Sequence, residues 1–251
     1  MRRHALALTV MLSFCAPAAA MVGGAATLSS HGQPVVMIVS DRGSFCTGTA
    51  IARDLVLTAA HCVLPGADYK LLEFDAERKP QLRDVASIAR HPQFQIKTLL
   101  AHRATADVAL LKLARPLAVT PAPLADASLR AAVGETFTVR GYGLAVRGDG
   151  KTGGTLRTAT LATTGQPGTL QIRLVDAATR GERAGLGACT GDSGAPTFTT
   201  SGPSAMIGVV SWSTGPGGSA GCGGLTGVTP LSLYKGWIVE QARKMGSPLA
   251  P

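Results

Sequence analysis

The sequence predicts an all-β protein, built as a sandwich or a barrel, with one helix at its end. Short runs of apolar and β-branched residues recur along the 251 residues, and glycine, proline, aspartate and serine separate them. The 31 glycines are typical of a chain with many tight turns. Frequent short strands with turn signals favour an all-β fold over one built from βαβ units.

The clearest strand patterns are spread over the whole chain. They lie at residues 35–40, 55–60, 108–113, 135–143, 170–175 and 205–213. Helical spacing occurs at 231–245, where four apolar residues fall on one side: Leu233, Trp237, Ile238 and Ala242. Residues 118–135 are rich in proline, alanine and small side chains and have no strand pattern, so we expect them to link two β units.

The first 20 residues have the three parts of a secretory signal peptide. Arg2 and Arg3 form a positive end, residues 5–14 form an apolar core, and an Ala-x-Ala cleavage site ends at Ala20. The alternative is an N-terminal core helix. The apolar core is too short to span a bilayer, and no later stretch is long enough, so no stable membrane insertion is expected. We expect a secreted or periplasmic protein whose leader, residues 1–20, is removed.

The charge of the chain argues against a nucleic-acid partner. The formal net charge is +9, and it falls to +7 without the two arginines of the leader. Lysine and arginine form no dense block, and aromatic residues that could stack on bases are few. A diffuse positive surface is the better interpretation.

The cysteines form an even set once Cys15 leaves with the leader. The remaining four are Cys46, Cys62, Cys189 and Cys222. In an exported chain this set predicts two disulfides. No spacing typical of a zinc site occurs, so no metal is expected.

Three segments carry residues with catalytic chemistry: LTAAHC at 57–62, ATADVALLKL at 104–113 and CTGDSGAP at 189–196. Each alone has a structural interpretation, because a histidine can pack beside a disulfide, an aspartate can end a strand, and GDSG can form a turn. Together they present His61, Asp107 and Ser193 in one of the chain orders known for a Ser–His–Asp triad. A serine hydroxyl needs such a base because it is a weak nucleophile at neutral pH.

With these motifs the sequence resembles the trypsin/chymotrypsin family of serine proteases. The resemblance runs from MVGG at Met21, through the three segments and SWS, to the YKGWI stretch near the end. It implies two six-stranded antiparallel β-barrels followed by a C-terminal helix. The first barrel, residues 21–120, would carry His61 and Asp107, and the second, residues 121–251, would carry Ser193.

The resemblance also implies the chemistry, that of an endopeptidase acting through an acyl-enzyme. Ser193 would be the nucleophile, His61 the general base and then acid, and Asp107 the group that orients His61. The backbone N–H groups of Gly191 and Ser193 would form the oxyanion hole. The implied disulfides are Cys46–Cys62, beside the histidine, and Cys189–Cys222, across the specificity pocket. No cofactor is expected.

Substrate-binding residues follow from the same resemblance. Gly187 would lie at the base of the primary pocket without a charge, and Gly227 would keep that pocket open. Ser213 would narrow the entrance, so small or medium apolar side chains should be preferred. An extended peptide would pair with the strand Ser211–Trp212–Ser213. Protein or peptide substrates, and possible protein inhibitors, are the expected partners of a monomer.

Several other features receive their own interpretation. Ala195 and Tyr142 depart from the family pattern and imply modest changes in packing. Glu73, Asp75 and Glu77 are expected to form a solvated acidic loop, the alternative being a calcium site. Three further histidines, His31, His91 and His102, have no partner motif and are assigned to loops.

The start of the mature chain predicts how the protein becomes active. In the family the new amino group of an IVGG-like segment pairs with the aspartate before the catalytic serine, which here joins Met21 to Asp192. Export and activation would then be one event. The alternatives are a zymogen that needs a second protease, and a catalytically weak or inactive homologue that binds partners through its basic surface.

Overall fold

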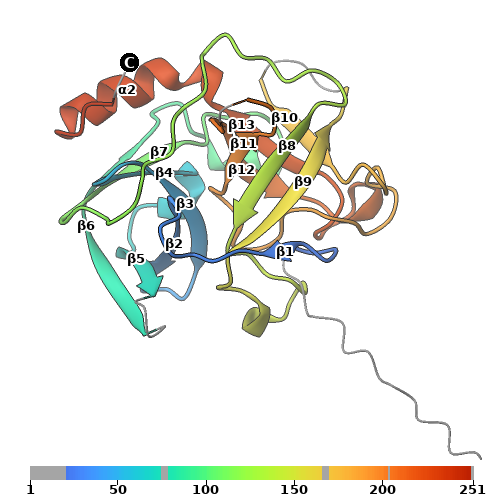
Figure 1. Ribbon diagram of the computed structural model, residues 1–251, viewed down its shortest axis with the longest axis horizontal. Coiled ribbons are helices and arrows are strands. Elements are labelled where there is room, and N and C mark those ends of the chain that lie inside the picture. The colour runs from blue at the N-terminus through green and yellow to red at the C-terminus, as the bar shows by residue number, and fades with distance from the viewer. Residues whose placement is uncertain (1–20, 75–78, 166–169, 203, 250–251) are drawn as a thin grey trace, which may run out of the picture.

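The computed structural model describes residues 21–74, 79–165, 170–202 and 204–249. It contains two closed, six-stranded antiparallel β-barrels and a C-terminal helix (Figure 1), which confirms the predicted fold. The expected signal peptide at 1–20 lies outside the described residues, as do Asp75 and Glu77 of the acidic loop. No helix in the described part of the chain is long and apolar enough to cross a membrane.

The first barrel closes in the order β2-β3-β4-β7-β6-β5. Its strands are β2 (Val35–Ser40), β3 (Phe45–Ala52), β4 (Leu55–Thr58), β5 (Tyr69–Phe74), β6 (Pro80–Arg90) and β7 (Ala109–Leu113). β2 is apolar from Val35 to Val39, and both faces of its first four residues are buried. Val36 and Ile38 point into the barrel, whereas Val35 and Met37 belong to a second apolar cluster that joins the two barrels.

The second barrel closes through the pairing of β8 with β9. Its strands are β8 (Thr136–Gly141), β9 (Arg157–Thr163), β10 (Ile172–Val175), β11 (Pro196–Thr199), β12 (Met206–Ser213) and β13 (Thr226–Pro230). Alternate residues fill its interior, including Phe137 and Val139 from β8 and Ala159 and Leu161 from β9. The short β1 (Ala26–Thr27) adds to the outer edge of β9.

Each end of the described chain packs on the barrel that is more distant from it in the sequence. Residues from Met21 onward pack with the second barrel, whereas α2 (Lys235–Lys244) sets Ile238 and Ala242 on the cluster that contains Leu110 of β7. The linker contacts both barrels, because the N–H of Ala122 bonds to β3 and that of Ala125 bonds to β12. These crossings tie the barrels into one unit with a cleft between them.

The short helices lie in the connections between strands. They are α1 (Ile96–Leu100) and the 3-10 turns η1 (Ala60–Val63), η2 (Gly150–Thr152), η3 (Pro216–Gly218) and η4 (Leu231–Leu233). The predicted helix at 231–245 is therefore interrupted, since η4 precedes α2. All six predicted strands form, most of them one to three residues shorter than predicted. The patterns did not single out the other seven strands of the described residues, which are β1, β3, β5, β6, β9, β11 and β13. β3 and β9 are rich in threonine and small residues, and most of β6 is exposed, so these three lack a clear apolar pattern.

Candidate active site

The first barrel holds His61 and Asp107 against each other. His61 lies in η1, directly after β4, and Asp107 lies two residues before β7. Nδ1 of His61 is 2.8 Å from Oδ2 of Asp107, and the His61 backbone N–H donates to Oδ1 at 3.0 Å. Asp107 is fully buried, and the Ser211 hydroxyl donates to its Oδ2 at 2.5 Å. These donors hold the carboxylate beside Nδ1 of His61, in a geometry that a proton on Nδ1 would complete.

Ser193 comes from the second barrel, in the loop between Cys189 and β11. It lines the same cleft as His61, with a volume of about 560 Å³. Trp212 and Ser213 of β12 line this cleft as well. The structure therefore brings the predicted serine and histidine to one cavity at the junction of the barrels.

The loop before Ser193 exposes two backbone donors. The N–H groups of Cys189, Asp192 and Gly194 are hydrogen-bonded, whereas those of Gly191 and Ser193 have no acceptor within the part of the chain that the structure describes. Gly191 has φ +94°, and a Cβ there would overlap the ring of Phe45. Only glycine fits this position without strain, and both Gly191 and Ser193 line the cleft.

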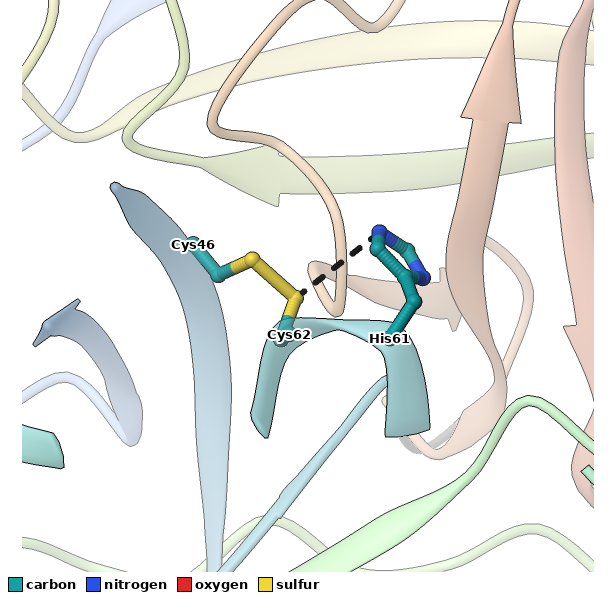
Figure 2. Close-up of side chains that lie close together, drawn as sticks. All are labelled: Cys46, His61 and Cys62. Carbon is teal, nitrogen blue, oxygen red and sulfur yellow. Dashed lines mark hydrogen bonds between the residues drawn. A yellow bond between two sulfur atoms is a disulfide. The ribbon is translucent and has the colours of Figure 1, made fainter. Parts of the chain in front are cut away.

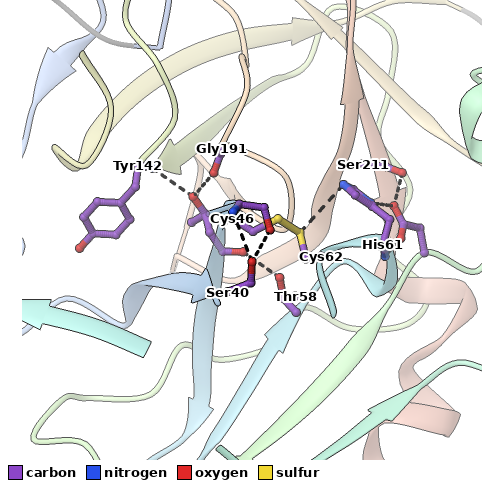
Figure 3. Close-up of a disulfide and its surroundings, with 11 residues drawn as sticks. Ser40, Cys46, Thr58, His61, Cys62, Tyr142, Gly191 and Ser211 are labelled. Atoms are coloured by element: carbon purple, nitrogen blue, oxygen red, sulfur yellow. Dashed lines mark hydrogen bonds and ion pairs between the residues drawn. A yellow bond between two sulfur atoms is a disulfide. The ribbon is translucent and has the colours of Figure 1, made fainter. Parts of the chain in front are cut away.

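Thr47 of β3 supports this loop from the first barrel and was not singled out in the sequence. Its hydroxyl donates to the carbonyl of Gly191 at 2.8 Å, and its N–H donates to the carbonyl of Ser193 at 2.8 Å. Thr47 also accepts a bond from the N–H of Tyr142. Figure 3 shows Gly191 and Tyr142 on one side of the Cys46–Cys62 disulfide and His61 with Ser211 on the other. The sequence Thr-Gly-Thr that follows Cys46 contains no motif from which this support of the loop could have been predicted.

Both predicted disulfides are present. Cys46–Cys62 joins β3 to η1, and Cys189–Cys222 joins the loop before Ser193 to the segment before β13. His61 lies close to both sulfurs of the first bridge, with Nε2 4.0 Å from Sγ of Cys62 (Figure 2). This group cannot hold a metal as thiolates would, because the two sulfurs are bonded to each other.

Asp192 is fully buried beneath the loop. Its carboxylate accepts the N–H of Gly143 and the N–H of Cys189, each at 2.9 Å. Burial raises its pKa from 3.8 to about 7, although these hydrogen bonds act in the opposite direction. A Cβ on Gly141 or Gly143 would overlap the carboxylate, so both glycines are needed to accommodate it.

The segment from Met21 packs into the apolar core of the second barrel. Met21 is fully buried in the cluster that includes Ala188 and Ala195, and Val22 forms an isolated bridge with Gly187. Gly23 has φ +90°, and a Cβ there would overlap the backbone of Gly185. Met21 and Gly23 thus have close neighbours in the second barrel, whereas Gly24 has open space around it.

The residues predicted for the primary pocket lie next to one another. Gly187 is buried, and a Cβ there would come 3.1 Å from Cα of Gly223 and 3.5 Å from Oγ1 of Thr226. The Ser213 hydroxyl donates to the carbonyl of Gly221 at 3.3 Å. A Cβ on Gly227 would overlap the indole of Trp212, so this glycine accommodates the tryptophan. None of these groups carries a charge.

All three unassigned histidines lie in loops, as predicted, and two of them also have aromatic partners. The His91 ring meets Tyr234 and Trp237 edge-on, at centroid distances of 5.1 and 4.9 Å. The His102 ring stacks on Trp212 at 4.8 Å. Glu73 was predicted to lie in a solvated acidic loop, but it belongs to strand β5, where its carboxylate forms an ion pair with Arg83 of β6 at 2.6 Å.

Comparisons with known proteins agree with this geometry. A family model described as Trypsin matches residues 21–238. The chain is similar to a trypsin from Phaedon cochleariae, with 30% identity over 221 residues that cover 78% of each chain. It is 29% identical to coagulation factor IX from Cavia porcellus, over 80% of this chain and 74% of that protein. A vitellin-degrading protease from Bombyx mori is 28% identical, over 78% and 76% of the two chains. The chain therefore belongs to the trypsin family of serine endopeptidases.

Proposed function

We propose that this chain is an exported endopeptidase that cleaves peptide bonds with His61, Asp107 and Ser193. The observation that carries the proposal is the hydrogen-bonded pair of His61 and Asp107 at the cleft that Ser193 also lines. The reaction needs only groups of this chain, a peptide and water.

The steps follow from the positions of these groups. The Ser193 hydroxyl attacks the scissile carbonyl carbon and gives its proton to Nε2 of His61. The negative oxygen that forms accepts the N–H groups of Gly191 and Ser193, a contribution of about 3–4 kcal/mol for each donor. His61 then protonates the leaving amine, which leaves an acyl-enzyme. Water repeats the sequence on the acyl group and releases the second product.

The uncharged primary pocket supports a preference for small or medium apolar side chains. Gly187, Gly223 and Thr226 offer no carboxylate that could pair with lysine or arginine. The Ser213–Gly221 hydrogen bond restricts the entrance to side chains of modest size. The backbone of an extended substrate would pair with the Ser211–Ser213 strand.

Removal of residues 1–20 would activate the enzyme. The new ammonium group of Met21 would pair with Asp192, whose buried carboxylate needs a cation to be ionised at neutral pH. Met21 has φ +43° in the uncleaved chain, a left-handed conformation that costs about 1–2 kcal/mol in a residue with a side chain. Cleavage before Met21 removes this constraint, because φ then no longer involves a preceding residue. The enzyme would remain blocked until a signal peptidase releases it outside the cytoplasm.

A fluorophosphonate probe tests the catalytic assignment. The exported protein should be labelled at Ser193, and both Ser193→Ala and His61→Ala should abolish labelling. Ser44→Ala is the matched control, since it removes a different hydroxyl from the same cleft and should still be labelled. A properly folded exported chain that is not labelled would instead be a binding homologue.

Peptide-library cleavage tests the pocket. Peptides with alanine, valine or leucine before the scissile bond should be cut faster than those with lysine or arginine. A clear preference for basic residues would refute the assignment of Gly187.

N-terminal sequencing tests the activation step. The exported protein should start at Met21, and a variant with two extra residues ahead of Met21 should fold but be nearly inactive. Full activity in the extended variant would contradict the pairing of Met21 with Asp192.

A further inference from the structure

Arg157 is a buried cation that the catalytic scheme does not use. It is the first residue of β9 and is 6% exposed. Its guanidinium donates to the carbonyl of Thr155 at 3.0 Å and to that of Thr152 at 3.5 Å, and its buried Nε has no partner. No carboxylate within the described ranges forms an ion pair with it. Burying a guanidinium in this way is costly, so its position needs a reason.

The strand register directs Arg157 towards Asp192. Arg157 lies directly opposite Gly141 in the β8–β9 pair. Side chains directly opposite each other leave an antiparallel sheet on the same face, with Cβ atoms about 5 Å apart. A Cβ on Gly141 would overlap the Asp192 carboxylate. The side chain of Arg157 therefore starts on the face of the sheet where the carboxylate is buried.

The surroundings of Asp192 contain little other charge. Gly143, two residues after the end of β8, offers its N–H, and the loop before Ser193 offers the N–H of Cys189. Arg140, the neighbour of Gly141 on β8, alternates to the other face and lies 5.1 Å above the Phe198 ring. The N-terminal segment adds a charge only when cleavage frees the amine of Met21. Among the described side chains, Arg157 is thus the cation that acts on Asp192, and its charge lowers the pKa that burial raises.

We propose that Arg157 is a positioning residue that keeps Asp192 ionised and thereby holds the loop of Gly191 and Ser193 in its active form. The carbonyls of Thr152 and Thr155 hold the guanidinium, so it acts as a charge at a distance. Since these contacts are to carbonyls, Arg157 does not compete with the amine of Met21 for a direct hydrogen bond to Asp192. This role rests on the proposed function, because it concerns the same loop and the same activating amine.

The test is the pH profile of the exported enzyme. Fluorophosphonate labelling and kcat/KM are measured from pH 5 to 9 for the unchanged protein and for Arg157→Met, Arg157→Lys and Arg140→Met. The acid limb of the profile is the range in which activity falls as the pH is lowered. Loss of the buried charge makes Asp192 easier to protonate, so Arg157→Met should shift the acid limb to a higher pH by about half to one unit. Arg157→Lys keeps the charge and should restore most of the original profile. Arg140→Met removes a comparable arginine from the neighbouring strand and should leave the acid limb unchanged.

The outcomes separate this role from the proposed function. An unchanged acid limb in folded Arg157→Met, or an equal shift in Arg140→Met, would overturn the role of Arg157 while labelling of the unchanged protein still supports the protease. Should Arg157→Met fail to fold, Arg157→Gln and Arg157→Lys replace it as a pair of long polar side chains that differ in charge. Identical profiles of that pair would overturn the proposal, and a higher acid limb in Arg157→Gln alone would support it.

Discussion

The buried carboxyl of Asp192 should make stability depend on pH in opposite senses before and after cleavage ahead of Met21. In the uncleaved chain burial raises its pKa from 3.8 to about 7. A group with a raised folded pKa contributes stability that is fully present below its unfolded pKa and is lost as pH rises through the folded value. The uncleaved chain should therefore lose stability between about pH 4 and pH 7.

The size of this effect follows from the two pKa values. Ionising a carboxyl with this shift costs the folded chain about 4 kcal/mol, and about 2.5 kcal/mol of that loss falls between pH 5 and pH 8. In the cleaved chain the ammonium of Met21 lowers the folded pKa of Asp192. Its contribution then has the opposite sign, because it is present above the unfolded pKa and is lost as pH falls.

Asp192→Asn separates the two cases, because asparagine keeps the shape and removes the charge. In a chain with two extra residues before Met21, the parent loses stability as the pH rises and the variant does not. The difference in unfolding free energy between variant and parent should therefore grow in favour of the variant by about 2.5 kcal/mol from pH 5 to pH 8. In a chain that starts at Met21, the same substitution should cost about 3–5 kcal/mol at pH 8, because it leaves a buried ammonium unpaired.

The assay is urea unfolding at pH 5, 6, 7 and 8 with intact disulfides, in a Ser193→Ala background that prevents self-digestion. Asp126→Asn is the control, since Asp126 is exposed and hydrogen bonds from Ser128 lower its pKa. It should not reproduce the gain in the extended chain. Equal effects of Asp192→Asn in the extended and the cleaved chains would refute the pairing with Met21.

Three further substitutions test the surroundings of the site. Gly191→Ala should lower fluorophosphonate labelling by about 10²–10³ in a folded protein, because φ +94° and Phe45 both exclude a Cβ; unchanged labelling would contradict the role of this loop. Thr47→Val should cost about 1–3 kcal/mol in urea unfolding and also reduce kcat, since the Gly191 carbonyl loses its donor. A loss of stability with normal kcat would show that Thr47 does not position the loop. Ser211→Ala removes a donor to Asp107 and should reduce kcat/KM by about tenfold or more with a smaller change in KM; a change in KM alone would assign Ser211 to substrate binding only.

The residues that carry the chemistry could be found in the sequence because each lies in a short, distinctive segment. His61 follows a strand in LTAAHC, and Ser193 lies in a glycine loop that tolerates few alternatives. The apolar run at 35–40 was recognisable as a strand because both of its faces are buried. The even set of cysteines predicted two disulfides, whereas their pairing came from the family resemblance.

Support for the site depends on contacts between residues that are far apart in the chain. Thr47 reaches Gly191 across 144 positions, and His102 stacks on Trp212 across more than a hundred. Arg157 lies opposite Gly141 only because β8 and β9 pair in one register. A threonine, a histidine or an arginine in a loop or strand carries no local sign of such a partner.

The sequence by itself determined the fold class, the reactive residue types and the order in which they occur. These properties depend on local patterns of side chains, which a chain carries whether or not it is folded. The tertiary structure decided which side chains support the reactive ones, and how deeply Asp192 and Arg157 are buried. Burial and charge are set by all the neighbours that surround a group in space, and the closed barrels bring those neighbours together from distant parts of the chain.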